Sequence, residues 1–460
     1  MKKTVLFLMN GFGIEQVDSY SIYNAKLMPN LDKYTTTELF STIESSAFDQ
    51  TDGYRLFSTG SNYSLTYTLI DQCMEKYQEN QNMNYYLDTI KEDTKIQLFL
   101  FIENEKSLEH IKAFLKFIRT KKQNPIYLHL VLTSTDINNY KEVEKVANKI
   151  MYDYKDLKIA SIVGENTLKA TNLVTYMNLL QNEVGEKWVD VTRKFITLTS
   201  NKVAPANAKE FHINSGFKIA PNDSFFFFNY NYTDFSNLLN NITKAINSSN
   251  YFSLFQMEGI KYPMYAYPSS GISMANSLNK IAAKALIMTN KQNMKVINYY
   301  CNGLKNNISD RLFFTELKIE DLEYIKAVIE RSEYDLIIID YRIDDVKNVM
   351  ELNGRLSKLD SILGNIHDFC VEKEITLFIS SLYGMKKELP IDNFMKAFVN
   401  FASKVPFIVV DPVFKKSNFH LGMGNVYNLA HTIYTNINNK YDGGEVLIKR
   451  NSQIAKMLKK

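Results

Sequence analysis

The sequence predicts an α/β protein in which a second α/β domain is inserted into the first. Three observations lead to this prediction. Apolar segments of strand length alternate with amphipathic segments of helix length. The alternation forms two series, with a change of pattern near residue 77 and a turn-rich segment at 262–271. A chain of 460 residues is also too long for one ordinary core. We therefore expect one domain to comprise residues 1–76 and 269–460, and the inserted domain to comprise 77–268.

The first apolar segment, at residues 5–9, is expected to be a buried strand. Asn10 and Gly11 follow it and predict a turn that redirects the backbone. Ligands of open α/β sheets bind at the carboxyl ends of the strands, so Asn10 would stand where chemistry is expected. A neutral asparagine amide is a poor choice for holding a metal ion. A polar, turn-rich segment at 44–62 and a helical stretch at 65–77 complete this part of the first domain.

The inserted domain has the alternation of βαβ units, which predicts a mostly parallel sheet. Its strands are expected at 96–101, 126–132 and 159–163, and its helices at 107–119, 140–154 and 169–182. Four consecutive phenylalanines at 225–228 predict a buried strand. No basic residues interleave with them, as they would on a surface that stacks bases.

The series that follows residue 269 returns to the first domain. Helices are expected at 274–286, 319–331, 349–371 and 392–402, and strands at 295–301, 336–340, 376–380 and 407–411. The basic tail at 449–460 predicts a solvated terminal helix.

Composition excludes several classes of protein. A net charge of +4 predicts no nucleic-acid partner. The three cysteines, Cys73, Cys301 and Cys370, are far apart and odd in number, which argues against a disulfide framework or a zinc knuckle and fits a reducing cytoplasm. The first apolar run is too short for a signal peptide, and no later run is long enough to span a membrane. We expect a soluble cytoplasmic protein without membrane insertion.

Several segments resemble the cofactor-independent phosphoglycerate mutases of the alkaline phosphatase superfamily. The opening strand, with GFGI at 11–14 and MPNLD at 28–32, is similar to that family's D-G-W-G and T-P-N-L-D. YDLIIIDYRIDDVKNV at 334–349 is similar to Y-D-F-I-V-L-N-F-A-N-P-D-M-V-G-H, and TLFISSLYGM at 376–385 to T-L-L-I-T-A-D-H-G-N. The resemblance implies an alkaline-phosphatase-like core domain with an inserted phosphotransferase-like domain.

The same resemblance implies that the catalytic residues are replaced. The family holds two divalent metals with three aspartates and three histidines, and its phosphorylated nucleophile is a serine. Of these positions only Asp345 keeps its residue type; the others carry Asn10, Gln50 at the serine, Val349, Leu382, Tyr383 and Asn400. Adjacent cations need carboxylates to offset their repulsion, and a primary amide cannot form a phosphoester. We therefore expect no metal pair, no cofactor and no catalytic residue.

The positions that bind the phosphorylated substrate in the family are also changed. Arginine is favoured there because its guanidinium makes bidentate hydrogen bonds to phosphate and carboxylate groups. His129 and Asp136 keep the family's residue type. The replaced positions carry Leu108, Thr135, Glu165, Asn231, Asp234, Ser236 and Asn293.

Two acids, Asp340 and Asp344, lie close to Asp345 in the sequence, and we interpret them as solvated loop acids rather than as a replacement metal cluster. The sequence also contains neither a GxxxxGK[ST] loop nor a GxGxxG turn, so it gives no motif for nucleotide binding.

Three functions remain open from the sequence. The first is a catalytically inactive subunit of a larger intracellular protein assembly, and this is the reading we expect. The second is a divergent active phosphomutase, phosphatase or nucleotide hydrolase with a site rebuilt around Asp49, Thr51, Asp52 and Asp345. The third is a small-ligand sensor that uses a cleft between the domains.

Overall fold

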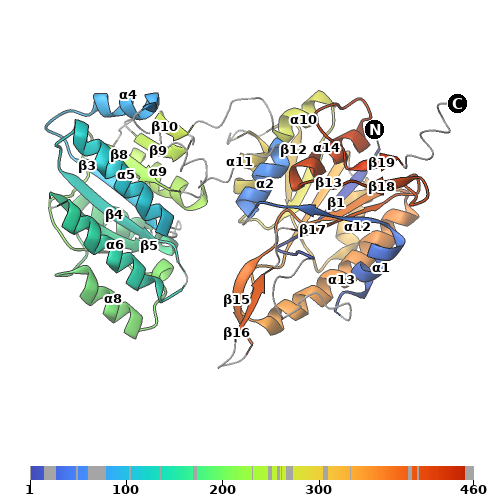
Figure 1. The fold of residues 1–460 in the computed structure, drawn as a ribbon, viewed down its shortest axis with the longest axis horizontal. Coiled ribbons are helices and arrows are strands. Elements are labelled where there is room, and N and C mark those ends of the chain that lie inside the picture. Colours follow the sequence, from blue (N-terminus) through green and yellow to red (C-terminus); the bar gives the residue numbers. More distant parts are fainter. Residues whose placement is uncertain are drawn as a thin grey trace. The chain divides into compact units, whose positions relative to one another are not determined.

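Two mixed sheets, each covered by its own helices, form the frame of the protein in the computed structural model (Figure 1). The structure describes residues 2–14, 27–47, 50–60, 79–102, 105–134, 136–154, 156–168, 173–229, 232–246, 251–255, 260, 262–265, 273–303, 309–331, 333–391, 396–400 and 404–450. Among these residues, no helix is long and apolar enough to cross a membrane.

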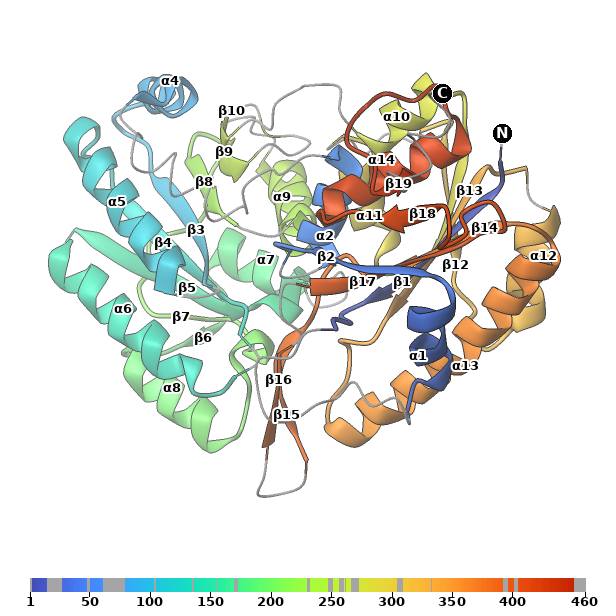
Figure 2. The ribbon, with the colours of Figure 1, turned by 45° about the vertical axis from the view of Figure 1, so that its right-hand side comes forward.

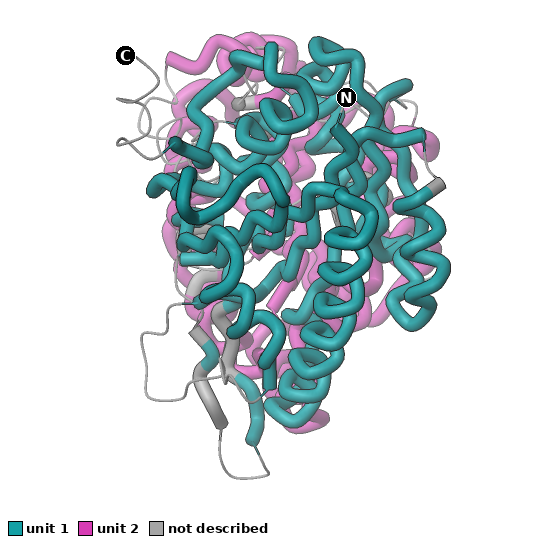
Figure 3. Tube along the Cα trace, turned by 90° about the vertical axis from the view of Figure 1, so that its right-hand side faces the viewer, with its two compact units in different colours: residues 1–65, 269–460 teal, residues 66–268 magenta. Residues whose placement is uncertain are grey.

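The chain divides into two compact units. Unit 1 comprises Met1–Leu65 and Ser269–Lys460, and unit 2 comprises Thr66–Pro268 (Figure 3). The second unit therefore lies in sequence between two segments of the first. The expected exit from the first domain near residue 77 falls outside the described residues.

The sheet of unit 1 is built around β1 (Thr4–Asn10), in which every residue is buried. Its strand order is β12-β11-β13-β1-β14-β17-β2, and all pairs are parallel except β14 with β17 and β17 with β2. The other strands are β2 (Leu39–Glu44), β11 (Ala285–Thr289), β12 (Leu312–Glu316), β13 (Leu336–Arg342), β14 (Thr376–Ser380) and β17 (Lys404–Val410). A central parallel strand is buried on both faces, which explains the continuous apolar run of β1.

Helices cover both faces of this sheet (Figures 1 and 2). One face carries α1 (Pro29–Thr37), α12 (Leu322–Arg331) and α13 (Val349–Glu372). The other face carries α2 (Gln50–Thr59), α10 (Met274–Lys280), α11 (Met294–Cys301) and α14 (Val426–Ile437). Side chains alternate along a strand, so Val5, Phe7 and Met9 of β1 pack in the core with α13, whereas Asn10 belongs to the face covered by α2.

Two small two-stranded antiparallel sheets complete the described part of unit 1. One joins β15 (Lys386–Pro390) to β16 (Lys396–Asn400) and extends away from the main sheet (Figure 2). The other joins β18 (Phe419–Leu421) to β19 (Ile448–Arg450).

The sheet of unit 2 has the strand order β10-β9-β8-β3-β4-β5-β7-β6 and is parallel except between β5 and β7. Its strands are β3 (Ile96–Ile102), β4 (Ile126–Leu132), β5 (Leu157–Gly164), β6 (Glu186–Lys187), β7 (Phe211–His212), β8 (Ser224–Phe228), β9 (Tyr251–Phe255) and β10 (Tyr262–Tyr265). Its helices are α4 (Gln81–Thr89), α5 (Glu105–Lys121), α6 (Asn139–Asp153), α7 (Leu173–Asn182), α8 (Val191–Ser200) and α9 (Tyr232–Ile246). The mostly parallel sheet predicted for this part of the chain is confirmed, as is the buried strand of phenylalanines in β8.

Several predicted elements of unit 1 are wrong. The strand expected at 295–301 is helix α11, because a parallel connection between β11 and β12 requires a crossover. The helix expected at 274–286 is shorter, because α10 ends at Lys280. Ala282 then adopts a φ of 57°, and strand β11 follows. Residues expected as a helix at 392–402 include strand β16.

Three further expectations are corrected. The turn-rich segment at 44–62 contains helix α2. The linker expected at 262–271 begins with strand β10, which pairs with β9. Lys449 and Arg450 of the basic tail belong to strand β19 rather than to a helix. The helix expected at 65–77 lies outside the described residues.

The start of α1 is held by a buried carboxylate on α13. Asp360, which is 3% exposed, accepts hydrogen bonds from the backbone N–H of Asn30 at 3.0 Å and of Leu31 at 2.9 Å. It also accepts one from Asn30 Nδ2 at 2.9 Å. These bonds satisfy donors that have no partner within the helix, so Asp360 ties the N-terminus of α1 to α13.

We expect Asp360→Ala to lower the free energy of unfolding of unit 1 by about 3 kcal/mol, because it leaves buried N–H groups without acceptors. Exposed Asp368 on the same helix is the matched control, and Asp368→Ala should cost about 0.5 kcal/mol or less. Far-UV circular dichroism during urea unfolding measures both. The single tryptophan, Trp188, lies in unit 2, so its fluorescence should report an unchanged transition. Equal effects of the two substitutions would contradict the role of Asp360 in holding the N-terminus of α1.

Candidate functional site

The carboxyl ends of three neighbouring strands meet below the first turn of α2. Asn10 ends β1, Asp340 lies near the end of β13, and Tyr383 follows β14. Gln50 begins α2 and completes the group. Asn10, Gln50, Asp340 and Tyr383 are all at least nine-tenths buried. The structure therefore brings together residues that are hundreds of positions apart in the sequence.

Asp340 is the centre of this group. Its Oδ1 accepts a hydrogen bond from Asn10 Nδ2 at 2.6 Å. Its Oδ2 accepts from Thr289 Oγ1 at 2.7 Å and from Gln50 Nε2 at 3.1 Å. The interpretation of Asp340 as a solvated loop acid is wrong, because the residue lies within strand β13 and is 2% exposed.

Arg342 lies two residues further along β13 and therefore on the same face as Asp340. Its Nη1 donates to Gln50 Oε1 at 3.1 Å. Its Nε and Nη2 both donate to Asp344, each at 3.0 Å, in a bidentate pair. Tyr383 donates its hydroxyl hydrogen to Asp344 Oδ2 at 2.8 Å. Asp344 is thus also engaged in an ion pair rather than being a solvated loop acid.

Charge and burial set the protonation of these groups. Burial raises the pKa of Asp340, and the hydrogen bonds from Thr289 and Asn10 and the charge of Arg342 oppose that shift. Burial acts to lower the pKa of Arg342, but the interactions with Tyr383 and Asp344 outweigh it, so the net pKa is raised. Burial and the charge of Asp344 raise the pKa of Tyr383. The guanidinium therefore stays charged, and the Tyr383 hydroxyl stays neutral as a donor.

Backbone contacts hold the loop after β14 against this group. The backbone N–H of Leu382 donates to Asn10 Oδ1 at 2.9 Å, and the hydroxyl of Ser45 donates to the Leu382 carbonyl at 2.6 Å. Gly53 of α2 lies so close that a Cβ there would be 2.7 Å from Leu382 Cβ. A glycine at this position allows the helix to approach the loop.

The remaining predicted site residues are not part of this group. Thr51 is half-buried in the first turn of α2, and Asp345 is exposed. Asp52 pairs with Arg55 at 2.9 Å. Val349 starts α13 and packs in the core, and Asn400 ends β16. Asp49 lies outside the described residues.

Arg342 and Thr289 were not predicted as site residues. Their signal in the sequence is weak, because each is a single polar residue at the end of an apolar strand, at positions that only the register of β11 and β13 brings together. In the part of the chain that the structure describes, no three His, Cys, Asp or Glu residues are grouped so that they could hold a metal ion.

Comparisons with known proteins show which proteins the chain is similar to. No protein-family model matches the chain. A 2,3-bisphosphoglycerate-independent phosphoglycerate mutase from Clostridium tetani is 21% identical over 457 residues, which cover 84% of this chain and 87% of that protein. The crystal structure of Leishmania mexicana phosphoglycerate mutase at low cobalt concentration aligns with a TM-score of 0.78 at 14% identity, covering 98% of each chain. The chain is therefore similar in sequence to a 2,3-bisphosphoglycerate-independent phosphoglycerate mutase over most of its length, and it shares the fold of the Leishmania mexicana enzyme.

The residues at the positions that the sequence resemblance assigns to two divalent metals do not fit such a pair. The side chains of Val349 and Leu382 offer no donor atom, and Tyr383 is a neutral phenol that donates its hydrogen. Both amide atoms of Asn10 are engaged in hydrogen bonds within the protein. The guanidinium of Arg342 already supplies positive charge beside Asp340 and Asp344.

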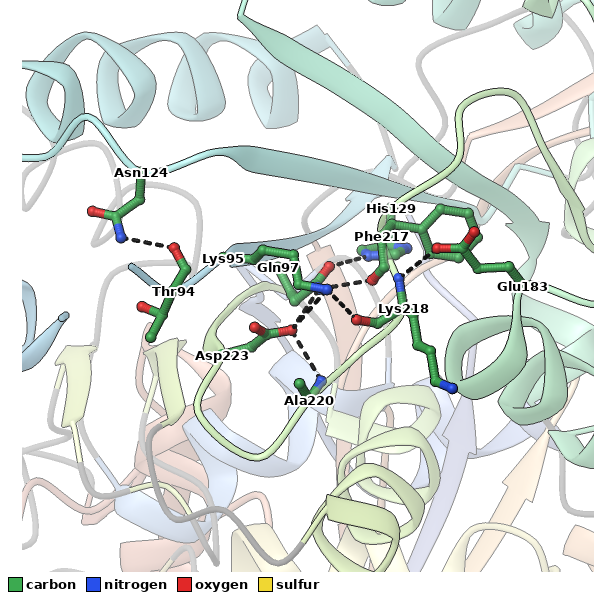
Figure 4. Close-up of polar contacts among 10 residues, drawn as sticks. All are labelled: Thr94, Lys95, Gln97, Asn124, His129, Glu183, Phe217, Lys218, Ala220 and Asp223. Atoms are coloured by element: carbon green, nitrogen blue, oxygen red, sulfur yellow. Dashed lines mark hydrogen bonds and ion pairs between the residues drawn. The ribbon is translucent and has the colours of Figure 1, made fainter. Parts of the chain in front are cut away.

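His129, one of the two residues that keep the mutase family's type in the inserted domain, is fully buried on β4 of unit 2. Its Nε2 lies 2.9 Å from Gln97 Oε1 (Figure 4). Its Nδ1 lies 2.7 Å from Ser161 Oγ. A glutamine carbonyl only accepts, so Nε2 carries the hydrogen and Nδ1 accepts from Ser161. Burial lowers the pKa of His129 to about 3. The imidazole is therefore a neutral hydrogen-bonding group.

Gln97 extends this buried contact toward the loop before β8. Its Nε2 donates to Asp223 Oδ2 and to the carbonyl of Phe217, both at 2.8 Å (Figure 4). Asp223 also accepts from the backbone N–H of Ala220 at 3.0 Å. These bonds occupy the polar atoms of His129 and Gln97 within the fold and hold the loop to the sheet.

The other positions compared with the mutase family's substrate site are spread over several elements. Asp136 bonds to the backbone N–H of Asn138 at 2.9 Å, and Glu165 begins a short 3-10 helix after β5. The remaining positions on described elements are Leu108 in α5, Asp234 and Ser236 in α9, and Asn293 before α11. Thr135 and Asn231 lie outside the described residues.

We expect Arg342→Ala to lower the free energy of unfolding of unit 1 by about 3 kcal/mol, because it leaves Asp344 and Gln50 without their shared partner. The matched control is Arg355, which pairs with Glu351 one helical turn away, and Arg355→Ala should cost about 0.5 kcal/mol or less. Far-UV circular dichroism during urea unfolding measures the difference. Loss of stability no greater than in the control would contradict the central role of Arg342.

We expect His129 to make unit 2 less stable as the pH falls from 6.5 to about 3. The unfolded chain takes up a proton below pH 6.5, while the folded imidazole does so only near its lowered pKa. Its contribution is fully present above pH 6.5 and declines by up to about 1.4 kcal/mol per pH unit below it. Urea unfolding followed by Trp188 fluorescence measures this slope. His129→Gln should give a shallower dependence of the unfolding free energy on pH. Identical slopes in the two proteins would refute the assignment of this pH dependence to His129.

Proposed function

We propose that the protein is a catalytically inactive homologue of phosphoglycerate mutase, which acts as a structural or interaction subunit of a larger cytoplasmic protein assembly. The observation that carries this proposal is the state of Gln50. Its amide stands where the resemblance puts the nucleophilic serine, and it is held between Asp340 at 3.1 Å and Arg342 at 3.1 Å. A primary amide in that place neither attacks phosphorus nor releases a proton.

The electrostatics of the group support inactivity further. Phosphoryl transfer needs concentrated positive charge to stabilise the attacking and leaving oxygens. Here the one guanidinium is bound by both oxygens of Asp344, so its charge is largely offset. Asp340 lies close by and adds negative charge when it is ionised. Such a group does not attract a phosphorylated acid.

We propose the interaction role because the protein has a well-packed fold although its buried polar group is not suited to phosphoryl transfer. Unit 1 has buried strands, the contact of Asp360 with α1 and the close packing of α2, so its surface is supported by a packed core. A scaffold that keeps its core can present binding surfaces after its reactive groups are replaced. We propose other protein subunits as partners, with no nucleic acid and no bound metal pair.

We expect no interconversion of 3- and 2-phosphoglycerate above the background without protein, in buffers that supply manganese or cobalt. Thr51→Ala should leave this result unchanged, because Thr51 is not part of the buried group. Elemental analysis of the purified chain should find manganese and zinc well below one equivalent. Turnover that Thr51→Ala abolishes, or two equivalents of metal per chain, would overturn inactivity and favour a rebuilt active site.

The interaction role has a separate test. The tagged full chain, recovered from native lysate and analysed by mass spectrometry, should retain a protein partner in a fixed stoichiometry. Recovery of the chain without any stoichiometric protein would contradict the interaction role while leaving the catalytic result untouched.

A further inference from the structure

Strand β12 is an edge of the seven-stranded sheet, and among the described residues it pairs with β11 alone. The Arg311 carbonyl accepts from the N–H of Ala285 at 2.9 Å, and the N–H of Leu317 donates to Thr289 at 3.0 Å. Backbone groups of a strand point alternately to its two sides. The N–H and C=O groups of Leu312, Phe314 and Glu316 therefore point away from β11, along the free edge of the sheet.

This edge carries few of the devices that prevent pairing with another strand. Natural edges are protected by proline, charged side chains, bulges, short length or a covering element, and the one charged residue of β12 is Glu316 at its end. The sequence of β12 is LFFTE, with no proline, no lysine and a regular register against β11. Phe313, Phe314 and Thr315 are only half-buried.

An apolar groove lies beside the same edge. It has a volume of about 500 Å³ and is lined by Leu286, Phe313, Phe314, Thr315, Tyr324, Ala327, Val328 and Tyr334. Tyr324, Ala327 and Val328 form a stripe along α12 at helical spacing, and the rings of Phe313 and Tyr334 lie 5.1 Å apart. The helix stripe and the strand edge together form one surface with which no other described strand pairs.

We propose that this surface binds a second copy of the same chain, through antiparallel pairing of β12 with β12 of the partner across a two-fold axis at Phe314. In this register Leu312, Phe314 and Glu316 form about six backbone hydrogen bonds with their counterparts. The two sheets become one continuous sheet, and the two grooves lie beside the axis. A self-complementary surface of this kind closes as a dimer.

Charge complementarity favours a second copy of the chain as the partner, and it favours strand pairing about Phe314. With Phe314 on the axis, exposed Asp310, which lies two residues before β12 of each chain, faces exposed Lys318, which lies two residues after β12 of the other. An axis at Glu316 would instead place two carboxylates opposite each other. The symmetric register at Phe314 therefore pairs opposite charges at both ends of the strand and buries aromatic side chains between them.

The proposal develops the interaction role proposed above and is tested on the purified full chain. Sedimentation equilibrium should give a dimer at micromolar concentration. Phe314→Pro should give a monomer, because it removes the outward N–H at the axis while the bonds of β12 to β11 do not use it. Phe314→Ala keeps that N–H and is the matched control, which should remain a dimer.

A charge swap tests the register. Lys318→Asp or Asp310→Lys alone should raise the dissociation constant of the dimer about tenfold, since each places like charges opposite each other twice. The double variant should restore the value of the unmodified chain. Circular dichroism verifies that each variant is folded.

A monomeric unmodified chain at high concentration, or a dimer that survives Phe314→Pro, would overturn this interface. Failure of the double variant to restore dimerisation would overturn the register. These outcomes are independent of the proposed function, which is tested by mutase turnover, metal content and partners from lysate. A monomer that still recovers a stoichiometric protein partner would refute the self-pairing alone.

Discussion

The burial of the Asp340 carboxylate is the constraint on which the arrangement of the first unit's polar centre depends. A carboxyl group removed from water needs hydrogen-bond donors on both oxygens, and a charge nearby, to remain in a folded protein. Asn10, Thr289 and Gln50 supply the donors from three separate elements, and Arg342 supplies the charge. The positions of β1, β11, β13 and α2 relative to one another are therefore fixed by one side chain as well as by apolar packing.

The residues of this centre complement one another in hydrogen bonding and charge. An amide at position 50 suits the space because it can donate to Asp340 and accept from Arg342 at the same time. Tyr383 contributes a neutral hydroxyl that Asp344 can accept, where an ionisable imidazole would change the charge balance. The positive charge in this centre is supplied by the Arg342 guanidinium, which belongs to the chain itself.

The second unit also contains a buried polar group whose hydrogen bonds are made within the protein, and this group is centred on His129. His129 keeps the residue type found in the mutase family, yet both of its ring nitrogens are bonded within the protein and burial keeps the ring neutral. Gln97 joins it to Asp223 and thereby to the loop before β8. Retention of a residue type in a distant homologue can therefore reflect the need to satisfy a buried strand rather than chemistry.

The sequence by itself determined the α/β class, the two series of strands and helices and most buried strands, since apolar periodicity is a local property of the chain. The resemblance of short segments also singled out Asn10, Gln50 and Tyr383, which the structure brings together in one buried group. The sequence misjudged Asp340 as solvated, and it read α11 as a strand and β16 as a helix. Only the tertiary structure decided these points, because the burial of a carboxylate, the need for a crossover helix and the pairing of a hairpin depend on partners far away in the sequence.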